Sequence, residues 1–205
     1  MTLRHCSENG FCARLSTSTR DALCARCAKA TLAGGTHVSV NFHSDFLLIE
    51  GLCVLEMDRD IDMVIRPGDF AMPPSFDPNS PERASAMDYG EDVGPIARET
   101  HLMAIKDSTY ASFDKKAVRE LFDIPEFALA MYENLRSFSG HAMYYHVAVF
   151  GQPAYDAVRH VLKFAKTYQL GPLTHAQIAL LTKRGRSTVT EAMHEIALAE
   201  PELLA

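Results

Sequence analysis

The sequence predicts an α+β protein in which an antiparallel β-roll of the jelly-roll type precedes a long helix and a C-terminal helix-turn-helix. Three observations lead to this prediction. Short β-rich runs separated by glycine and proline lie between Thr36 and Phe113, an apolar heptad repeat runs from Ala128 to Val149, and two short helical patterns joined by a tight turn occupy Leu173 to Ile196. The element types and their order define the fold class.

The composition is that of a folded, soluble chain. It has 205 residues, of which 47% are hydrophobic, enough for buried cores. No run of about 18 apolar residues occurs, and the N-terminal MTLRHCSENGF has charge and glycine where a signal peptide needs an apolar centre. We therefore expect a cytoplasmic protein with no membrane partner, divided into residues 1–124, 125–151 and 152–205.

The charge is unevenly distributed along the chain. Residues 1–152 hold 14 Lys and Arg against 21 Asp and Glu, whereas residues 153–205 hold 6 against 5. Lys183, Arg184 and Arg186 form a local cationic patch with no acid between Thr174 and Thr190. A patch this small gives weak, salt-dependent binding to phosphates, so two copies in a dimer would be needed to hold nucleic acid.

Four cysteines lie near the N-terminus. Cys6 and Cys12 precede an expected helix from Thr17 to Thr31, in which Cys24 and Cys27 would lie one turn apart. Clustered thiolates suit zinc or an iron–sulfur cluster, and inert buried thiols are the alternative. The chain has five cysteines, an odd number without a secretory signal, so we expect thiols or ligands more than a disulfide framework.

The expected roll begins at Thr36. THVSVNF alternates, FLLIE and LCVLEM are β-rich runs separated by Gly51, and DMVIR leads to a turn at Pro67-Gly68. Glycine suits both turn positions because these turns require positive φ. Residues 71–95 contain five prolines and form a loop, after which THLMAIK and YASF resume strand character and close the roll.

Two helices follow the roll. Asp114 caps a short helix with the sequence KKAVRELF, and Pro125 starts a long one that Gly151-Gln152-Pro153 ends as a hinge. Ser139-Gly140 is expected to weaken or bend its middle. Apolar residues spaced three and four apart predict a coiled-coil seam on this helix: Ala128, Met131, Leu135, Phe138, Ala142, Tyr145 and Val149. An amphipathic helix packed on its own domain would give much the same stripe.

A bridging helix from Tyr155 to Tyr168 leads to the C-terminal motif. Thr174 and Gln177 form a capping box for the first helix, and TKRG makes the turn to a second helix that opens at Arg186. The apolar faces consist of Ile178, Ala179 and Leu181, then Val189, Ala192, Met193 and Ile196. The pattern indicates a helix-turn-helix, and an ordinary helical hairpin is the alternative.

The motif resembles the DNA-reading motif of the Crp/Fnr transcription regulators. Arg186 falls on the base-contacting arginine of that family, and Thr188 and Val189 fall on its "T-V" pair. Two positions differ, since Glu191 stands where many members have a second arginine and Lys183 replaces the turn glycine.

The resemblance implies a sensor β-roll, a dimerisation helix and a DNA-binding domain. Gly51 and Gly68 match the paired glycines of the family's roll. Double-stranded DNA, a second copy of the chain and RNA polymerase would be its partners, and a small-molecule, metal or redox effector would control it. The expected DNA contacts are Lys183, Arg184, Arg186, Ser187, Thr188, Thr190 and Glu191.

Three segments depart from the family. Gly90-Glu91 follows Arg83-Ala84-Ser85, the reverse of the family's phosphate cassette, so we do not expect cyclic AMP or cyclic GMP. The segment HCSENGFCARLS resembles the cysteine segment of the oxygen-sensing Fnr branch only in the spacing of Cys6 and Cys12. ALAEPELLA follows Ile196 where the family has a β-hairpin wing, so we expect the wing to be missing or vestigial.

Two other classes of function fit parts of the sequence. The first is a β-roll ligand-binding module whose helix-turn-helix no longer binds DNA, which Glu191 and the missing wing suggest. The second is a cupin-like enzyme, but His43 is the only histidine in the segment where a cupin needs a pair. We therefore expect a protein that is not an enzyme.

Overall fold

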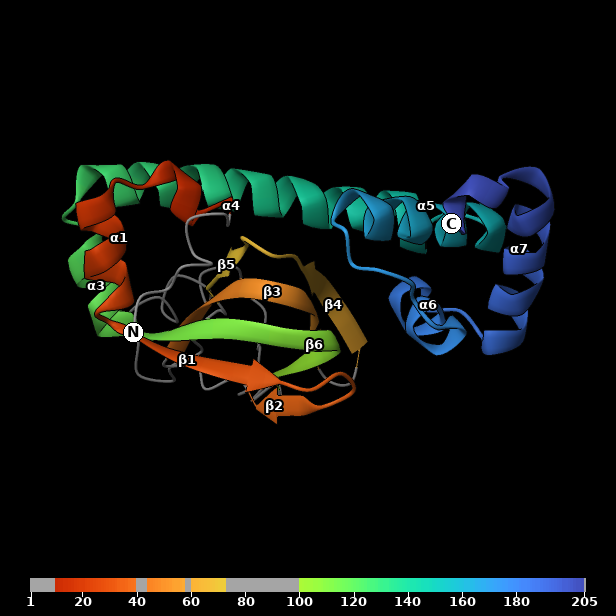
Figure 1. Ribbon diagram of the computed structural model, residues 1–205, viewed down its shortest axis with the longest axis horizontal. Helices are drawn as coiled ribbons and strands as arrows, with labels where there is room; N and C mark the ends of the chain where they lie inside the picture. The colour runs from red at the N-terminus through yellow and green to blue at the C-terminus, as the bar shows by residue number, and fades with distance from the viewer. Residues whose placement is uncertain (1–9, 40–43, 58–59, 73–99, 205) are drawn as a thin grey trace, which may run out of the picture.

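The computed structural model describes residues 10–39, 44–57, 60–72 and 100–204. A β-roll lies beneath one long helix, and a cluster of shorter helices lies at one end of that helix (Figure 1). The predicted α+β class, with a roll followed by a long helix and a helical C-terminal part, is confirmed.

The roll is a single antiparallel sheet. Its strands are β1 (Cys27–Leu32), β2 (His37–Ser39), β3 (Ser44–Met57), β4 (Asp60–Ile65), β5 (Phe70–Ala71) and β6 (Thr100–Asp114). The main order is β1-β6-β3-β4, with β2 added to β6 and β5 added to β3. The two longest strands, β3 and β6, therefore form the centre of the roll.

Gly51 does not separate two strands as predicted. FLLIE and LCVLEM belong to the one strand β3, whose register against β6 shifts on both sides of Glu50. Gly51 has φ +92°, and a Cβ there would lie 2.7 Å from the Cα of Ser108. It is the glycine of a β-bulge where two backbones approach closely. Gly68, also at φ +92°, does lie in the predicted turn, and its N–H donates to the Leu48 carbonyl at 2.8 Å.

The helix predicted from Thr17 to Thr31 is wrong beyond Cys24. A short 3-10 turn, η2 (Cys12–Arg14), precedes α1 (Thr17–Cys24), and β1 then begins at Cys27 and pairs with β6, with Cys27 opposite Phe113. The segment joins the edge of the sheet because β6 offers it a complete ladder of backbone partners. Pairing with a distant strand outweighs local helix preference here.

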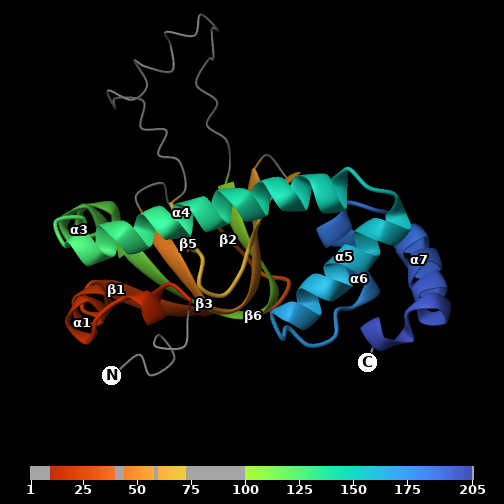
Figure 2. The ribbon, with the colours of Figure 1, turned by 90° about the horizontal axis from the view of Figure 1, so that it is seen from above.

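The two helices predicted after the roll are present. Asp114 caps α3 (Lys115–Leu121) by accepting from the Lys116 N–H at 2.8 Å. α4 (Pro125–Tyr145) begins at the predicted proline and continues as a π-helical turn, η3 (His146–Phe150). Figure 2 shows α4 running along the whole length of the roll.

Asn134 fixes α4 on the roll. Its buried side chain accepts from the Phe70 N–H at 3.1 Å and donates to the Phe70 carbonyl at 2.8 Å, so it continues the edge of β5. Phe127 and Met131 of α4 are fully buried against an aromatic group that includes Phe70 and Phe113. This face of α4 is therefore used by the chain itself.

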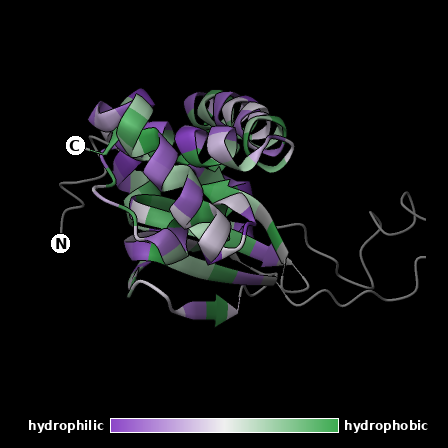
Figure 3. Ribbon diagram, turned by 90° about the vertical axis from the view of Figure 1, so that its right-hand side faces the viewer, coloured by the Kyte–Doolittle hydropathy of each residue, from purple (hydrophilic) through white to green (hydrophobic). Residues whose placement is uncertain are grey.

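The C-terminal part consists of α5 (Ala154–Thr167), α6 (His175–Thr182), α7 (Arg186–Ala199) and the 3-10 turn η4 (Pro201–Leu203). Seen from this end in Figure 3, polar and apolar residues alternate along the helices, as amphipathic helices require. η4 packs back on α5, where Glu200 pairs with Arg159 and accepts from the Tyr155 hydroxyl at 3.1 Å. Residues 200–204 contain no strand of the kind that a wing would need.

None of the helices within the described ranges combines the length and apolar character that crossing a membrane requires.

Candidate nucleic-acid interface

The helix-turn-helix is built as its local sequence predicts. The Thr174 hydroxyl accepts from the Gln177 N–H at 3.2 Å, and the Gln177 side chain accepts from the Thr174 N–H at 2.8 Å, which completes the capping box. Lys183 ends α6 in the left-handed region at φ 54° and ψ 38°. It occupies the left-handed backbone conformation that glycine would favour at this position.

α7 turns one face inward and one face to solvent. Val189, Ala192 and Ile196 are buried, as predicted. Arg186, Ser187, Thr190 and Glu191 are exposed, while Thr188 is half-buried. The exposed polar face begins at the N-terminus of the helix, where backbone N–H groups without helical partners favour anions.

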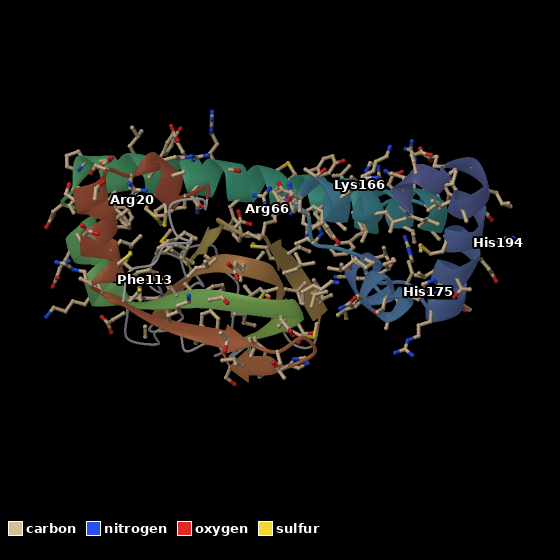
Figure 4. All side chains as sticks on the ribbon, viewed as in Figure 1. Arg20, Arg66, Phe113, Lys166, His175 and His194 are labelled. Atoms are coloured by element: carbon tan, nitrogen blue, oxygen red, sulfur yellow. The ribbon has the colours of Figure 1, made fainter. Side chains whose placement is uncertain are left out.

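Two histidines extend this polar face. His194 is exposed on the outer side of α7, and His175 of α6 lies 3.1 Å from the Thr190 hydroxyl through its Nδ1 atom (Figure 4). The sequence-based prediction did not include either residue. Ser187, Glu191 and His194 are spaced four and three residues apart, which places His194 on the same helix face as the other two. This spacing could have identified His194 from the sequence.

Lys183 and Arg184, which the sequence predicts to contact the DNA backbone, both have contacts within the chain. The Arg184 Nη2 atom donates to the carbonyls of Gln152 at 2.7 Å and Phe150 at 3.2 Å. The Lys183 ammonium lies 4.4 Å from the centre of the Phe150 ring. The hinge therefore attracts both cations, Arg184 through two carbonyl groups and Lys183 through an aromatic ring, and would compete with phosphate for them.

The predicted seam on α4 is partly buried in the chain's own cores. Met131 packs against the roll, while Tyr145 and Val149 pack in a core that the roll and the C-terminal helices share. In this conformation these three side chains are not accessible to a partner. Ala128, Phe138 and Ala142 are half-buried, and Leu135 is exposed.

A different line of large side chains on α4 faces solvent. We call it the exposed α4 stripe, and it consists of Leu129, Tyr132 and Met143 of α4 and Val147 of the π-helical turn η3 that continues it, each 61–72% exposed. At ~100° per residue the four positions fall within a sector of about 60° on the helix surface. Arg136, which is exposed, lies in the same sector between the two pairs, with the small residues Ser139 and Gly140 beside it.

The cysteine residues do not assemble a metal site in the described structure. Cys12 is disulfide-bonded, although the sequence predicted a thiol or a ligand there, and Cys6 lies outside the described residues. Cys24 and Cys27 are free thiols whose pKa values are raised, chiefly by burial, which disfavours the thiolate that a metal needs. Within the described ranges no three His, Cys, Asp or Glu side chains converge to hold a metal ion.

A cleft separates the roll from the C-terminal helices. It has a volume of about 880 Å³ and is lined by the β1–β2 turn, the central strands near Gly51 and Ile105, and the segment leading into α6. Two bonds cross beside it: the Gln177 Nε2 atom donates to the Ile105 carbonyl at 2.6 Å, and the Lys106 ammonium donates to the Pro172 carbonyl at 2.5 Å. A ligand in this cleft would contact both parts of the molecule.

The segments on which the cyclic-nucleotide and cupin arguments rest, including Arg83, Gly90 and His43, lie outside the described residues.

No protein-family model matches the sequence, and no curated protein matches it. Solved structures do match. The c-di-GMP responsive global regulator CLP of Xanthomonas campestris is 12% identical, with 90% of this chain and 93% of that chain covered at a TM-score of 0.62. A CooA mutant from Carboxydothermus hydrogenoformans is 13% identical, with 97% and 85% covered at 0.58.

A putative transcriptional regulator of the Crp/Fnr family from Eubacterium rectale is 12% identical, with 93% of this chain and 87% of that chain covered at a TM-score of 0.55. The chain therefore has the fold of the Crp/Fnr regulators, as the sequence resemblance implied.

Proposed function

We propose that this protein is a homodimeric, sequence-specific DNA-binding transcription regulator and that α7 is its recognition helix. The observation that carries the proposal is the solvent-facing polar surface at the start of α7, with Arg186 exposed while Val189 and Ile196 hold the helix in its core. The similar folds, which belong to proteins described as regulators rather than enzymes, support it.

Each exposed group on α7 suits a particular part of DNA. The Arg186 guanidinium can donate to O6 and N7 of a guanine together. Ser187 and Thr188 lie at the helix N-terminus, where hydroxyl and N–H groups bind phosphate, and Thr190 lies one turn further along. Glu191 can accept from a cytosine amino group, which would make it a selecting residue instead of a phosphate contact.

The dimer that we propose uses the exposed α4 stripe. Four large apolar side chains in one sector of a long helix are unfavourable to leave in water, and the exposed Arg136 between them can extend its charged end to solvent at the edge of the contact. A second copy of this chain presents the same stripe, so a two-fold axis along α4 buries both at once. The seam differs from the predicted one because Met131, Tyr145 and Val149 are already buried.

A small molecule is the effector that the described residues support best. The cleft beside Ile105 and Gln177 is lined by both the roll and α6. A molecule bound there would therefore change how stably the helix-turn-helix packs against the roll. The described cysteines do not support a metal or an iron–sulfur cluster.

A ligand-binding module without DNA function is the second interpretation. It would explain the acid at Glu191 on the exposed face of α7. The intact capping box and the exposed Arg186 favour a working recognition helix over a decayed one.

The substitution Arg186→Ala tests the proposal. On a duplex selected from random sequences by the wild-type protein, we expect it to weaken binding by about 1–3 kcal/mol and to relax preference at one base pair. Its melting temperature should be unchanged because the side chain is exposed. Fluorescence anisotropy measures the affinity, and Arg20→Ala on the distant helix α1 is the control. Equal affinity of the Arg186→Ala and wild-type proteins for the selected duplex would contradict the proposal.

A further inference from the structure

Three side chains link the helix-turn-helix turn to the end of α4 and the hinge that follows it. The Tyr145 hydroxyl donates to the Leu181 carbonyl at 3.0 Å in the protein interior. Arg184 and Lys183 make the two contacts to the hinge already described. We call these contacts the hinge clamp.

The clamp completes the C-terminal cap of the long helix. The last carbonyls of a helix have no hydrogen-bond donor within the helix. Here several of them accept from residues just after the helix or from the turn between α6 and α7. The Gly151 N–H donates to His146, and the Gln152 side chain donates to Val147 at 3.1 Å. The Phe150 carbonyl, the last of the π-helical turn, accepts from Arg184. A guanidinium also complements the negative end of the helix dipole.

Arg184 is placed for this role and not for phosphate. Its guanidinium reaches two carbonyls of the hinge, and its Nε atom is buried. Both bonds come from the single Nη2 atom, and a lysine ammonium, although it also has several N–H donors, would have to reach the same two carbonyls from a shorter and more flexible side chain. Releasing Arg184 to bind DNA would leave the Phe150 and Gln152 carbonyls without this donor.

We propose that Arg184 is the positioning residue that locks the helix-turn-helix on the end of α4 and thereby sets the distance between the two DNA half-sites that a dimer reads, with Lys183 assisting it. The inference rests on the proposed function, because half-site spacing has meaning only for a DNA-binding dimer. α4 carries the proposed dimer axis, and α7 carries the exposed polar residues that are proposed to contact DNA. The joint between these two helices therefore determines where the two α7 helices of a dimer lie.

The test compares Arg184→Gln, Arg184→Lys and Arg186→Gln with the wild-type protein. Each is titrated against the selected duplex and against duplexes with one or two base pairs added or removed at the centre, over a series of KCl concentrations. A positioning residue affects the spacing preference. A residue that binds phosphate affects the salt dependence of binding. The slope of the logarithm of the binding constant against the logarithm of the KCl concentration changes by about 0.9 for each phosphate that is no longer neutralised.

For Arg184→Gln we expect discrimination between the selected spacing and the altered ones to fall at least about tenfold, because two charge-assisted hydrogen bonds are removed, with the salt slope unchanged. Arg184→Lys, which keeps the charge and several N–H donors on a shorter side chain, should restore the discrimination only in part. Arg186→Gln should lose affinity and keep the spacing preference. A shallower salt slope for Arg184→Gln with an intact spacing preference would overturn the inference.

Hydrogen exchange in the free protein separates the clamp from the proposed function. Arg184→Gln should speed exchange of the amides of Gly151 and Gln152, and of the turn between α6 and α7, while the amides of β3 and β6 keep the wild-type rate. If exchange at the hinge increases but no DNA sequence is selected, the proposed function fails and the clamp stands. If exchange at the hinge is unchanged, the clamp itself is contradicted.

Discussion

Lys183 shows how one residue tolerates an unfavourable backbone conformation. Its left-handed φ costs a non-glycine residue about 1–2 kcal/mol. The contact of its ammonium with the Phe150 ring offsets part of that cost, because a cation over an aromatic face is attracted by about 0.5–1 kcal/mol at an exposed site. A position where glycine would be unstrained is therefore occupied here by a residue whose side chain has a contact of its own.

His141 gives a prediction at the residue scale. Its ring stacks on Phe164 at 5.5 Å between centroids, and its Nε2 atom is buried without a hydrogen-bond partner among the described residues. Burial, with a smaller effect of Arg66, lowers its pKa to about 4. The unfolded chain, with a His pKa near 6.5, binds the proton first as pH falls, so acid favours unfolding between about pH 6.5 and 4.

We expect His141→Phe, which keeps the ring stack, to remove this part of the pH dependence. The free energy of unfolding of the wild-type protein should fall relative to the variant by less than about 1.4 kcal/mol per pH unit, since the ring is only half-buried. Urea denaturation at several pH values measures the difference. Parallel pH profiles for the two proteins would show that His141 is not responsible.

Single residues also show what a sequence can predict. The roles of Asp114, of Thr174 with Gln177, and of Gly68 could be predicted, since each acts on backbone groups within three residues or at a local turn. The role of Arg184 could not, because its partners lie 34 and 32 residues away. A cation in a turn is expected to be solvent-exposed unless the packing of a distant helix end is known.

At the scale of elements, α4 has two apolar stripes where the sequence predicted one seam. The predicted positions include Met131, Tyr145 and Val149, which face the roll and α5, whereas the exposed α4 stripe lies about one residue further along. Heptad spacing alone cannot distinguish a face packed on its own chain from a face packed on a partner. The helix was predictable, and its orientation was not.

The substitution Met143→Glu tests the exposed α4 stripe. It places a charge at a position 72% exposed in one chain, so the fold should persist while a dimer is disrupted. We expect the wild-type protein to sediment at twice the 22.7 kDa chain mass and the variant to sediment as a monomer with an unchanged melting temperature. Val38→Glu, at an exposed position of β2, is the control. A monomeric wild-type protein would rule out this dimer.

Arg66 joins the roll to the C-terminal helices. Its guanidinium bonds both oxygens of Asp69, at 2.9 and 3.0 Å, and the Tyr168 hydroxyl at 2.8 Å. Figure 4 labels it at the junction of the two parts. Arg66 and Asp69 are both buried, so removal of one partner leaves an uncompensated charge in the protein interior.

We expect Arg66→Ala to lower the free energy of unfolding by about 3–5 kcal/mol, because it breaks a buried ion pair. The matched control is Arg14→Ala, which removes an exposed ion pair with Glu133 and should cost less than about 1 kcal/mol. Thermal and urea denaturation measure both. Similar losses for the two variants would mean that the buried pair does not stabilise the junction between roll and helices.

At the scale of the whole molecule, local signals predicted the order of the parts, and distant contacts determined how they join. Strand runs, caps and turns predicted a roll, a long helix and a helix-turn-helix. The bulge at Gly51 and the start of β1 at Cys27 depend on β6, which lies more than 50 residues along the chain. The cleft and the hinge clamp arise only when the roll, α4 and the helix-turn-helix meet.

The central claim is that two copies of this chain present two α7 helices to DNA as one unit. Selection of bound sequences from a pool of random duplexes tests it most directly. We expect enrichment of a two-fold symmetric motif whose half-sites lie about one helical turn, roughly 10 base pairs, apart, with a guanine in each half-site that Arg186→Ala no longer selects. A pool that shows no enriched sequence after repeated rounds with the folded protein would contradict the account.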